Sequence, residues 1–140
     1  MALAPPFRVA GLFMKPSPQS DAGSQFDTWR EQLRRGGLEL AILLSLARGA
    51  RYGLEIIRHL EESTDLVVTE GTIYPILARL SRDQMLAAEW REDGTHPRKY
   101  YRLTPRGRRR LTEMTGLWEE FAGKLSRLIA AARGGNDDAH

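Results

Sequence analysis

Apolar residues recur at helical intervals along the first half of the chain and predict three successive helices. The first, at 24–36, has three large residues on one face: Phe26, Trp29 and Leu33. We expect it to end at the glycine pair Gly36 and Gly37. The second, at 38–49, is apolar nearly all round, as in a helix buried at the centre of a domain. The third, at 52–63, turns one apolar edge inward: Ile56, Ile57 and Leu60.

A fourth helix is predicted from the segment TEGTIYPILARL, residues 69–80, with Thr69 as a suitable N-cap. Its inward stripe has the i, i+3, i+4, i+7 spacing of a helix packed on a core: Ile73, Ile76, Leu77 and Leu80. Pro75 lies within this stripe and should sit near the first turns and loosen them, because proline has no N–H to donate. The opposite side offers solvent a phenol and two arginines: Tyr74, Arg79 and Arg82.

The apolar pattern then changes from helical to alternating. Apolar and more polar residues alternate at 86–90, and 99–103 is rich in β-forming residues. Between these segments lies Asp93-Gly94, followed by Thr-His-Pro. The pattern predicts a β-hairpin whose tip is a loop of several residues.

A long helix is expected at 105–133, after Thr104 as N-cap and with Pro105 as its first residue. Its apolar residues are spaced 3, 4, 3, 4 and 3 apart: Leu111, Met114, Trp118, Phe121, Leu125 and Leu128. Such a seam needs a partner, and pairing across a two-fold axis would bury it, together with the apolar face of the helix at 24–36. The alternative is that this helix folds back on its own domain. Residues 134–140 are expected to be a frayed tail.

Composition narrows the class of protein further. The chain has 41% hydrophobic and 28% charged residues, as an ordinary soluble globular chain does. It contains no cysteine, which excludes disulfides and thiolate metal sites and favours a reducing cytoplasm. No apolar run approaches the length of a membrane span. Residues 1–23 are rich in Pro, Ser, Ala and Gly and are expected to be a disordered extension.

The order of the predicted elements, helices followed by a hairpin, is that of a winged helix-turn-helix. We therefore expect a mainly α fold with a small β-hairpin, comprising a DNA-binding domain at 37–104 and a dimerisation helix at 105–133. In this fold the helix before the hairpin enters the major groove, and the hairpin lies beside it on the backbone or minor groove. The outward side of the helix at 69–80 would then face DNA.

The residues expected to contact double-stranded DNA lie on that helix and on the second strand of the hairpin. The first turn of the helix can offer N–H groups and threonine hydroxyls to a phosphate. Arg98 and Lys99 begin a basic run that reaches Arg110 without an acid, and such cations release counterions from DNA. A basic run of this kind is also typical of a solvated surface. The expected contacts are Thr69, Thr72, Tyr74, Arg79, Arg98 and Lys99.

Three segments in this order resemble the PadR family of bacterial transcriptional regulators: YGLEII (52–57), TEGTIYPILARL and RKYYRLTPRGRRRL (98–111). The resemblance covers roughly 38–111 and implies a dimeric winged helix-turn-helix repressor, joined through its C-terminal helix. Such regulators are often autoregulatory or control a nearby transporter or stress-response gene. The single C-terminal helix is similar to the shorter subfamily. Two departures are the N-terminal extension and Gln84-Met85, where the family commonly has a glycine after the recognition helix.

Other functions are weighed against the same residues. His59, His96 and His140 are scattered, and no catalytic triad, glycine-rich phosphate loop or metal-ligand spacing occurs, so we expect no enzyme, cofactor or metal. A protein-binding adaptor is the main alternative, since Glu70 would repel a phosphate and the net charge is only +3. Trp118 and Phe121 are either the core of the dimer or the walls of a cavity for a small aromatic ligand.

Overall fold

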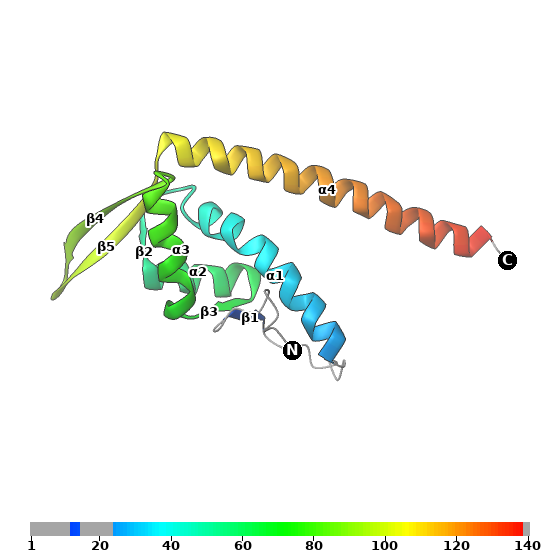
Figure 1. The fold of residues 1–140 in the computed structure, drawn as a ribbon, viewed down its shortest axis with the longest axis horizontal. Helices are drawn as coiled ribbons and strands as arrows, with labels where there is room; N and C mark the ends of the chain where they lie inside the picture. Colours follow the sequence, from blue (N-terminus) through cyan, green and yellow to red (C-terminus); the bar gives the residue numbers. More distant parts are fainter. Residues whose placement is uncertain (1–11, 15–23, 139–140) are drawn as a thin grey trace, which may run out of the picture.

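The structure is a computed structural model that describes residues 12–14 and 24–138. The described part of the chain contains the helices α1 (Ser24–Ser45), α2 (Gly53–Thr64), α3 (Glu70–Arg82) and α4 (Pro105–Asp138). Its strands are β1 (Leu12–Met14), β2 (Arg51–Tyr52), β3 (Leu66–Val68), β4 (Leu86–Asp93) and β5 (His96–Leu103). In Figure 1, α1, α2 and α3 form one body, from which β4 and β5 project, while α4 extends away. None of the described helices is long and apolar enough to cross a membrane.

The core lies where α1, α2 and α3 meet and confirms the predicted inward stripes. Three of the expected residues of α3 are fully buried: Ile73, Leu77 and Leu80. The fourth, Ile76, is partly buried and packs against the core. The central apolar segment contributes the α1 part of the core: Ile42, Leu43 and Leu46. From α2 come Ile56 and Leu60. Fully buried aliphatic side chains contribute about 1.5–3 kcal/mol each through the removal of apolar surface from water.

The expected helix end at Gly36-Gly37 is wrong, because α1 runs unbroken from Ser24 to Ser45. A glycine inside a helix costs only about 1 kcal/mol relative to alanine, so a pair of them weakens a helix without ending it. Burial of Leu38, Ile42 and Leu43 immediately after the pair compensates for this cost. The two predicted helices at 24–36 and 38–49 are therefore one.

One added strand and a shorter hairpin tip differ from the sequence-based expectation. β5 pairs with β4 on one side and with the unpredicted β2 on the other, giving an antiparallel sheet of order β2-β5-β4. Asp93 pairs with His96, so the tip is a two-residue turn rather than a loop of several residues. Gly94 adopts a φ of 68° there, as glycine does at the first central position of a tight hairpin turn.

The segment before α3 is also a strand. β3 pairs antiparallel with β1, with Phe13 opposite Val67. The expectation of a disordered extension at 1–23 is therefore wrong for Leu12–Met14, whose backbone forms hydrogen bonds with one edge of β3. Residues 1–11 and 15–23 lie outside the described residues, and so does the end of the expected tail at 139–140.

α4 begins where predicted and extends beyond the expected end. The Thr104 Oγ1 accepts a hydrogen bond from the Gly107 N–H at 2.9 Å, which confirms Thr104 as the N-cap. The helix continues through Gly134 and Gly135 to Asp138, so the expected frayed tail from 134 is wrong as far as Asp138. The two glycines weaken the last turns without a steric bar to helix formation.

The turn at the end of α3 carries a residue in a conformation that suits glycine. The Met85 N–H donates to the Leu80 carbonyl at 2.9 Å and the Gln84 N–H to the Ser81 carbonyl at 3.1 Å, the pattern of a Schellman motif. Gln84 holds a φ of 62° in this motif. A glycine would take this conformation without strain, so Gln84 forms the turn at a higher cost.

We therefore expect Gln84→Gly to stabilise the protein by about 1 kcal/mol, because the left-handed conformation costs a residue with a Cβ about that much. Urea unfolding at fixed protein concentration measures the change. The same replacement at Asp83, where φ is −79°, should destabilise the fold and serves as the control. Equal destabilisation by both substitutions would contradict the argument.

Candidate nucleic-acid interface

The start of α3 places one expected contact outside and one inside. Thr69 is exposed and extended, with φ −86° and ψ 163°, and its carbonyl accepts the N–H of Thr72 at 3.1 Å and of Ile73 at 3.0 Å. Its side chain makes no capping bond, and its hydroxyl lies 3.5 Å from the Thr72 hydroxyl. Thr69 thus keeps its hydroxyl at the surface, while Thr72 is only 6% exposed and lies on the buried side of α3.

Tyr74 both packs and remains accessible. Its ring lies against Gly53, the first residue of α2, so closely that a Cβ on Gly53 would meet the phenol oxygen at 2.5 Å. The side chain is nevertheless 38% exposed. Burial, and to a lesser degree Glu70, raises the pKa of the Tyr74 phenol above its usual value. The hydroxyl therefore stays protonated at neutral pH and can donate to a phosphate.

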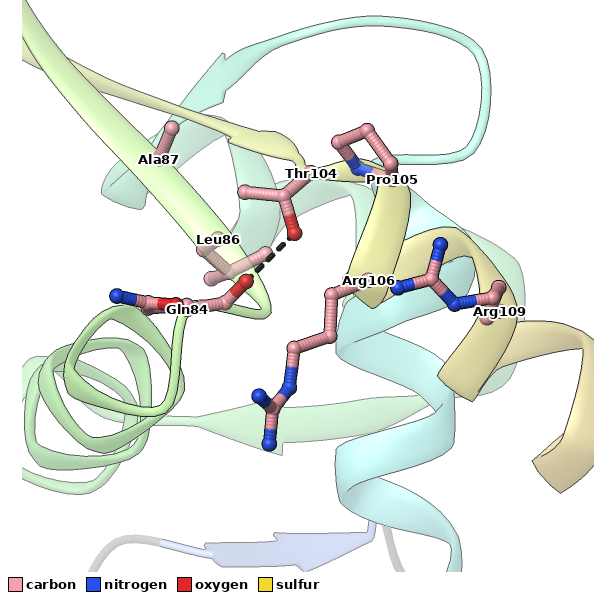
Figure 2. A pocket seen from close by; sticks show the side chains of 7 residues that line it. All are labelled: Gln84, Leu86, Ala87, Thr104, Pro105, Arg106 and Arg109. Carbon is pink, nitrogen blue, oxygen red and sulfur yellow. Dashed lines mark hydrogen bonds between the residues drawn. The ribbon is translucent and has the colours of Figure 1, made fainter.

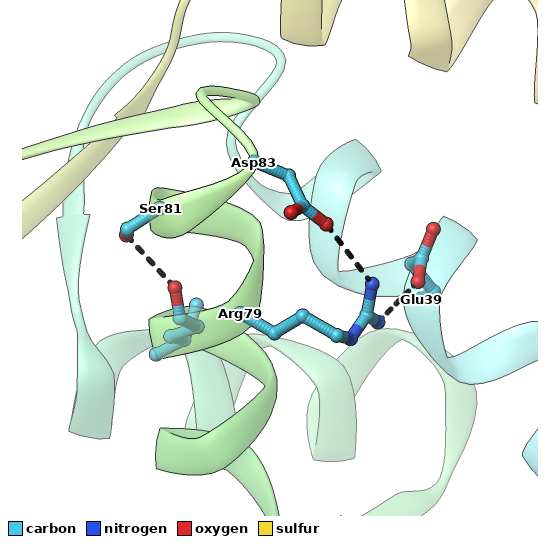
Figure 3. Close-up of polar contacts among 5 residues, drawn as sticks. Glu39, Arg79, Ser81 and Asp83 are labelled. Carbon is cyan, nitrogen blue, oxygen red and sulfur yellow. Dashed lines mark hydrogen bonds and ion pairs between the residues drawn. The ribbon is translucent and has the colours of Figure 1, made fainter.

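Arg79 is held by acids of its own chain. Figure 3 shows its guanidinium between Glu39 of α1 and Asp83, which lies 3.9 Å from it at the end of α3. All three side chains are partly exposed, so these ion pairs contribute at most about 1 kcal/mol to stability. They turn the arginine toward α1, away from the start of the helix where Thr69 and Tyr74 lie. Its expected role as a DNA contact stays a prediction.

Arg98 and Lys99 lie on opposite faces of the hairpin β4–β5, here called the wing. Register and alternation along the strands define an outer face of Arg91, Asp93, Arg98 and Tyr100 and an inner face of Trp90, Glu92, Lys99 and Tyr101. The inner face leads into the core through buried Tyr101. The Lys99 ammonium lies 6.0 Å from the centre of the exposed Trp90 ring and 5.9 Å from that of Tyr101.

The outer face forms a cluster that the sequence did not suggest. Asp93 Oδ2 accepts hydrogen bonds from the Tyr100 hydroxyl at 2.7 Å and from Arg98 Nη1 at 3.1 Å. The Arg98 guanidinium lies 4.4 Å from the centre of the Tyr52 ring, which meets Tyr100 edge to face. Arg91 lies 4.5 Å from the centre of the Tyr100 ring. The sequence indicates this cluster only through the two motifs that contain its tyrosines, YGLEII and RKYYRL.

The charge of the wing is more balanced than the basic run alone indicates. That run has no acid between Arg98 and Arg110, but β4 places Glu89 opposite Tyr100 and Glu92 opposite Pro97. Arg91 is bonded to Glu89, and Arg98 to Asp93. Strand pairing therefore brings the acid Asp93 of β4 next to Arg98 of β5.

An open cavity of about 600 Å³ lies between the end of α3, the start of β4 and the start of α4 (Figure 2). Its lining residues are Gln84, Leu86, Ala87, Thr104, Pro105, Arg106 and Arg109. The Thr104 hydroxyl donates to the Gln84 carbonyl at 2.6 Å and so ties the start of α4 to the turn after α3. Both arginines are exposed, and no acid is among the described residues that line the cavity. The described chain holds no cluster of His, Cys, Asp or Glu suited to a metal ion.

The seam predicted on α4 divides into two parts. Leu111 and Met114 are partly buried against the core of their own domain. The other four are exposed: Trp118, Phe121, Leu125 and Leu128. The three apolar residues of the first helix are exposed as well: Phe26, Trp29 and Leu33. α4 therefore packs on its own domain only through its first turns, and two apolar helix faces remain uncovered within the described chain.

Three helices in sequence followed by an antiparallel wing define a winged helix-turn-helix protein. The Transcriptional regulator PadR-like family matches residues 42–113, from the buried part of α1 into the third turn of α4. The chain belongs to this family of transcriptional regulators.

Relatives of known structure and sequence agree with this assignment. Transcriptional regulator Rv3488 of Mycobacterium tuberculosis is 35% identical over 94 residues, which make up 67% of this chain and 87% of the relative. The structure of a PadR-like transcription factor from Bacteroides fragilis is 40% identical, covers 73% of this chain and 99% of its own, and has a TM-score of 0.61. A PadR family transcriptional regulator from Eggerthella lenta is 33% identical, with coverage of 75% and 92% and a TM-score of 0.66.

Proposed function

We propose that the protein is a cytoplasmic, sequence-specific DNA-binding repressor that acts as a homodimer on a palindromic operator, without catalysis. The observation that carries the proposal is the exposure of polar groups on α3 and the wing of a PadR-family domain. They are Thr69, Tyr74, Arg98 and Lys99. Hydroxyls and cations of this kind bind phosphates and position a recognition helix in the major groove.

The uncovered apolar faces support the homodimer. Trp118, Phe121, Leu125 and Leu128 follow a heptad spacing on α4, which in a monomer would leave them in water. A two-fold pairing of α4 with the partner's helices would bury them and would set two recognition helices in successive turns of the major groove.

A protein-binding adaptor remains the second candidate, and two observations favour it. Glu70 is an exposed acid in the first turn of α3, where it would repel a phosphate. Arg79 forms ion pairs with Glu39 and Asp83, so acids of its own chain already neutralise part of its charge. An adaptor would use the same exposed surface without reading a DNA sequence.

A gel shift with the DNA upstream of the protein's own gene, against a scrambled duplex at several salt concentrations, separates the two candidates. A repressor that regulates its own gene should bind the upstream DNA selectively, with affinity that falls steeply as salt rises. Salt-sensitive binding to both duplexes alike would count against this operator. Failure to bind either duplex would favour the adaptor.

We further propose that a small aromatic effector relieves repression by binding between Trp118 and Phe121 at the dimer interface. Both side chains are exposed in the single chain, Trp118 by 45% and Phe121 by 65%. In a dimer joined through α4 they would face the same two residues of the partner. Binding should quench tryptophan fluorescence, and Trp118→Ala should abolish the quenching. Quenching that survives in Trp118→Ala would assign it to Trp29 or Trp90 and leave these two rings as dimer core.

A further inference from the structure

The wing cluster contains an acid where a DNA-binding surface would be expected to exclude one. The Asp93 carboxylate lies on the outer face beside Arg98, and both side chains are 43% exposed. An ion pair this exposed adds little to stability, because water screens the attraction and two side chains must be ordered. On charge alone, Asp93 should weaken DNA binding by repelling phosphates and by neutralising Arg98.

The geometry around Arg98 suggests a different role for the acid. The central carbon of the guanidinium lies over the Tyr52 ring, 4.4 Å from its centre, and Asp93 accepts one hydrogen bond from Nη1 at 3.1 Å. A guanidinium has five N–H donors in a rigid fork, so most of them remain for a further acceptor. Tyr52 is the N-cap residue of α2, and its N–H donates to the Glu55 carboxylate at 3.1 Å, which fixes the platform under Arg98.

Asp93 is itself fixed from the opposite direction. The Tyr100 hydroxyl donates to the carboxylate at 2.7 Å, and this bond, more than the nearby Arg98, lowers the pKa of Asp93. The same bond raises the pKa of the Tyr100 phenol. Donor and acceptor therefore keep their protonation states throughout the neutral range. Tyr100 pairs with Tyr52 across β5 and β2, so the residue that holds Asp93 and the ring beside Arg98 are neighbours in the sheet.

We propose that Asp93 is a positioning residue of the wing, which together with Tyr52 holds the Arg98 guanidinium ready to bind a phosphate of the DNA backbone. This inference rests on the proposed DNA-binding function and assigns its wing contact. A long arginine side chain ordered before binding loses less conformational entropy when it meets its phosphate. Asp93 then strengthens DNA binding even though its charge opposes it.

Opposite signs of effect make the proposal testable. Asp93→Ala removes a negative charge and the acceptor of both hydrogen bonds, and Glu92→Ala removes the same charge one residue away, on the inner face of the same strand. Without positioning, both variants should bind DNA more tightly. With positioning, Glu92→Ala should bind slightly more tightly and Asp93→Ala about fivefold more weakly, the cost of ordering one flexible side chain. Tyr100→Phe, which removes the hydroxyl that holds Asp93, should weaken binding in the same direction.

The experiment measures fluorescence anisotropy of the full chain with a duplex selected by the protein from a randomised library and with a scrambled duplex. A double-mutant cycle with Arg98→Ala shows whether Asp93 acts through Arg98: in that background Asp93→Ala should no longer weaken binding. Thermal unfolding of each variant excludes loss of fold as the cause. If the wild type prefers neither duplex, the proposed function itself fails. If it discriminates and Asp93→Ala binds as tightly as Glu92→Ala, the positioning role is overturned.

Discussion

Gly107→Ala is expected to lower the free energy of unfolding by about 3 kcal/mol, because its new methyl group would collide with backbone. A Cβ at this position would lie 2.0 Å from the Met85 carbonyl oxygen and 3.0 Å from the carbonyl carbon. That oxygen also accepts hydrogen bonds from the Thr104 N–H and hydroxyl, both at 3.1 Å. Relieving the collision therefore pulls the start of α4 away from the turn that leads into β4.

Gly116→Ala provides a matched control on the same helix. A Cβ at Gly116 meets nothing within 4 Å, so alanine there should stabilise the helix by up to about 1 kcal/mol. Urea denaturation at equal protein concentrations measures both variants, since the stability of a dimer depends on concentration. If Gly107→Ala proved as stable as Gly116→Ala, the close approach of α4 to Met85 would be wrong.

The close contact between α4 and Met85 shows why the spacing of residues in the sequence predicts the helices and the hairpin but not the contacts between them. The stripe of α3, the hairpin and the start of α4 are encoded by neighbouring residues, through side-chain period and capping. β2 has two residues, and its pairing depends on β5, which lies far along the chain. No local period marks so short a strand. The continuity of α1 across its glycine pair likewise depends on burial that follows the pair, not on the pair itself.

The surroundings of the predicted interface residues follow from the sequence only in part. Thr69, Tyr74 and Lys99 lie at the surface as expected. The sequence predicts that Thr72 offers its hydroxyl to a phosphate, yet Thr72 is buried, because it lies one helical turn before Ile76 on the core side of α3. Arg79 has an acid partner on α1, forty residues away, which sequence spacing cannot pair with it.

Phe121→Glu is expected to convert the proposed dimer into monomers and to weaken binding to a palindromic operator by at least about a hundredfold, because two tethered half-site contacts become independent. Phe121 is at the middle of the exposed part of the seam and is 65% exposed in the single chain. A dimer would bury it, and a carboxylate there would lose its hydration without gaining a partner. Sedimentation equilibrium gives the assembly state, and anisotropy gives the DNA affinity.

Ser126→Glu is the control for this prediction, because it adds the same charge to an exposed position next to the seam. It should remain dimeric and lose only the small affinity that an added negative charge causes. A Phe121→Glu protein that stays dimeric would move the interface from α4 to the exposed face of α1 formed by Phe26, Trp29 and Leu33. A monomer that still bound the full operator with wild-type affinity would show that a single wing and recognition helix suffice. The two-fold arrangement of half-sites would then have no role in recognition.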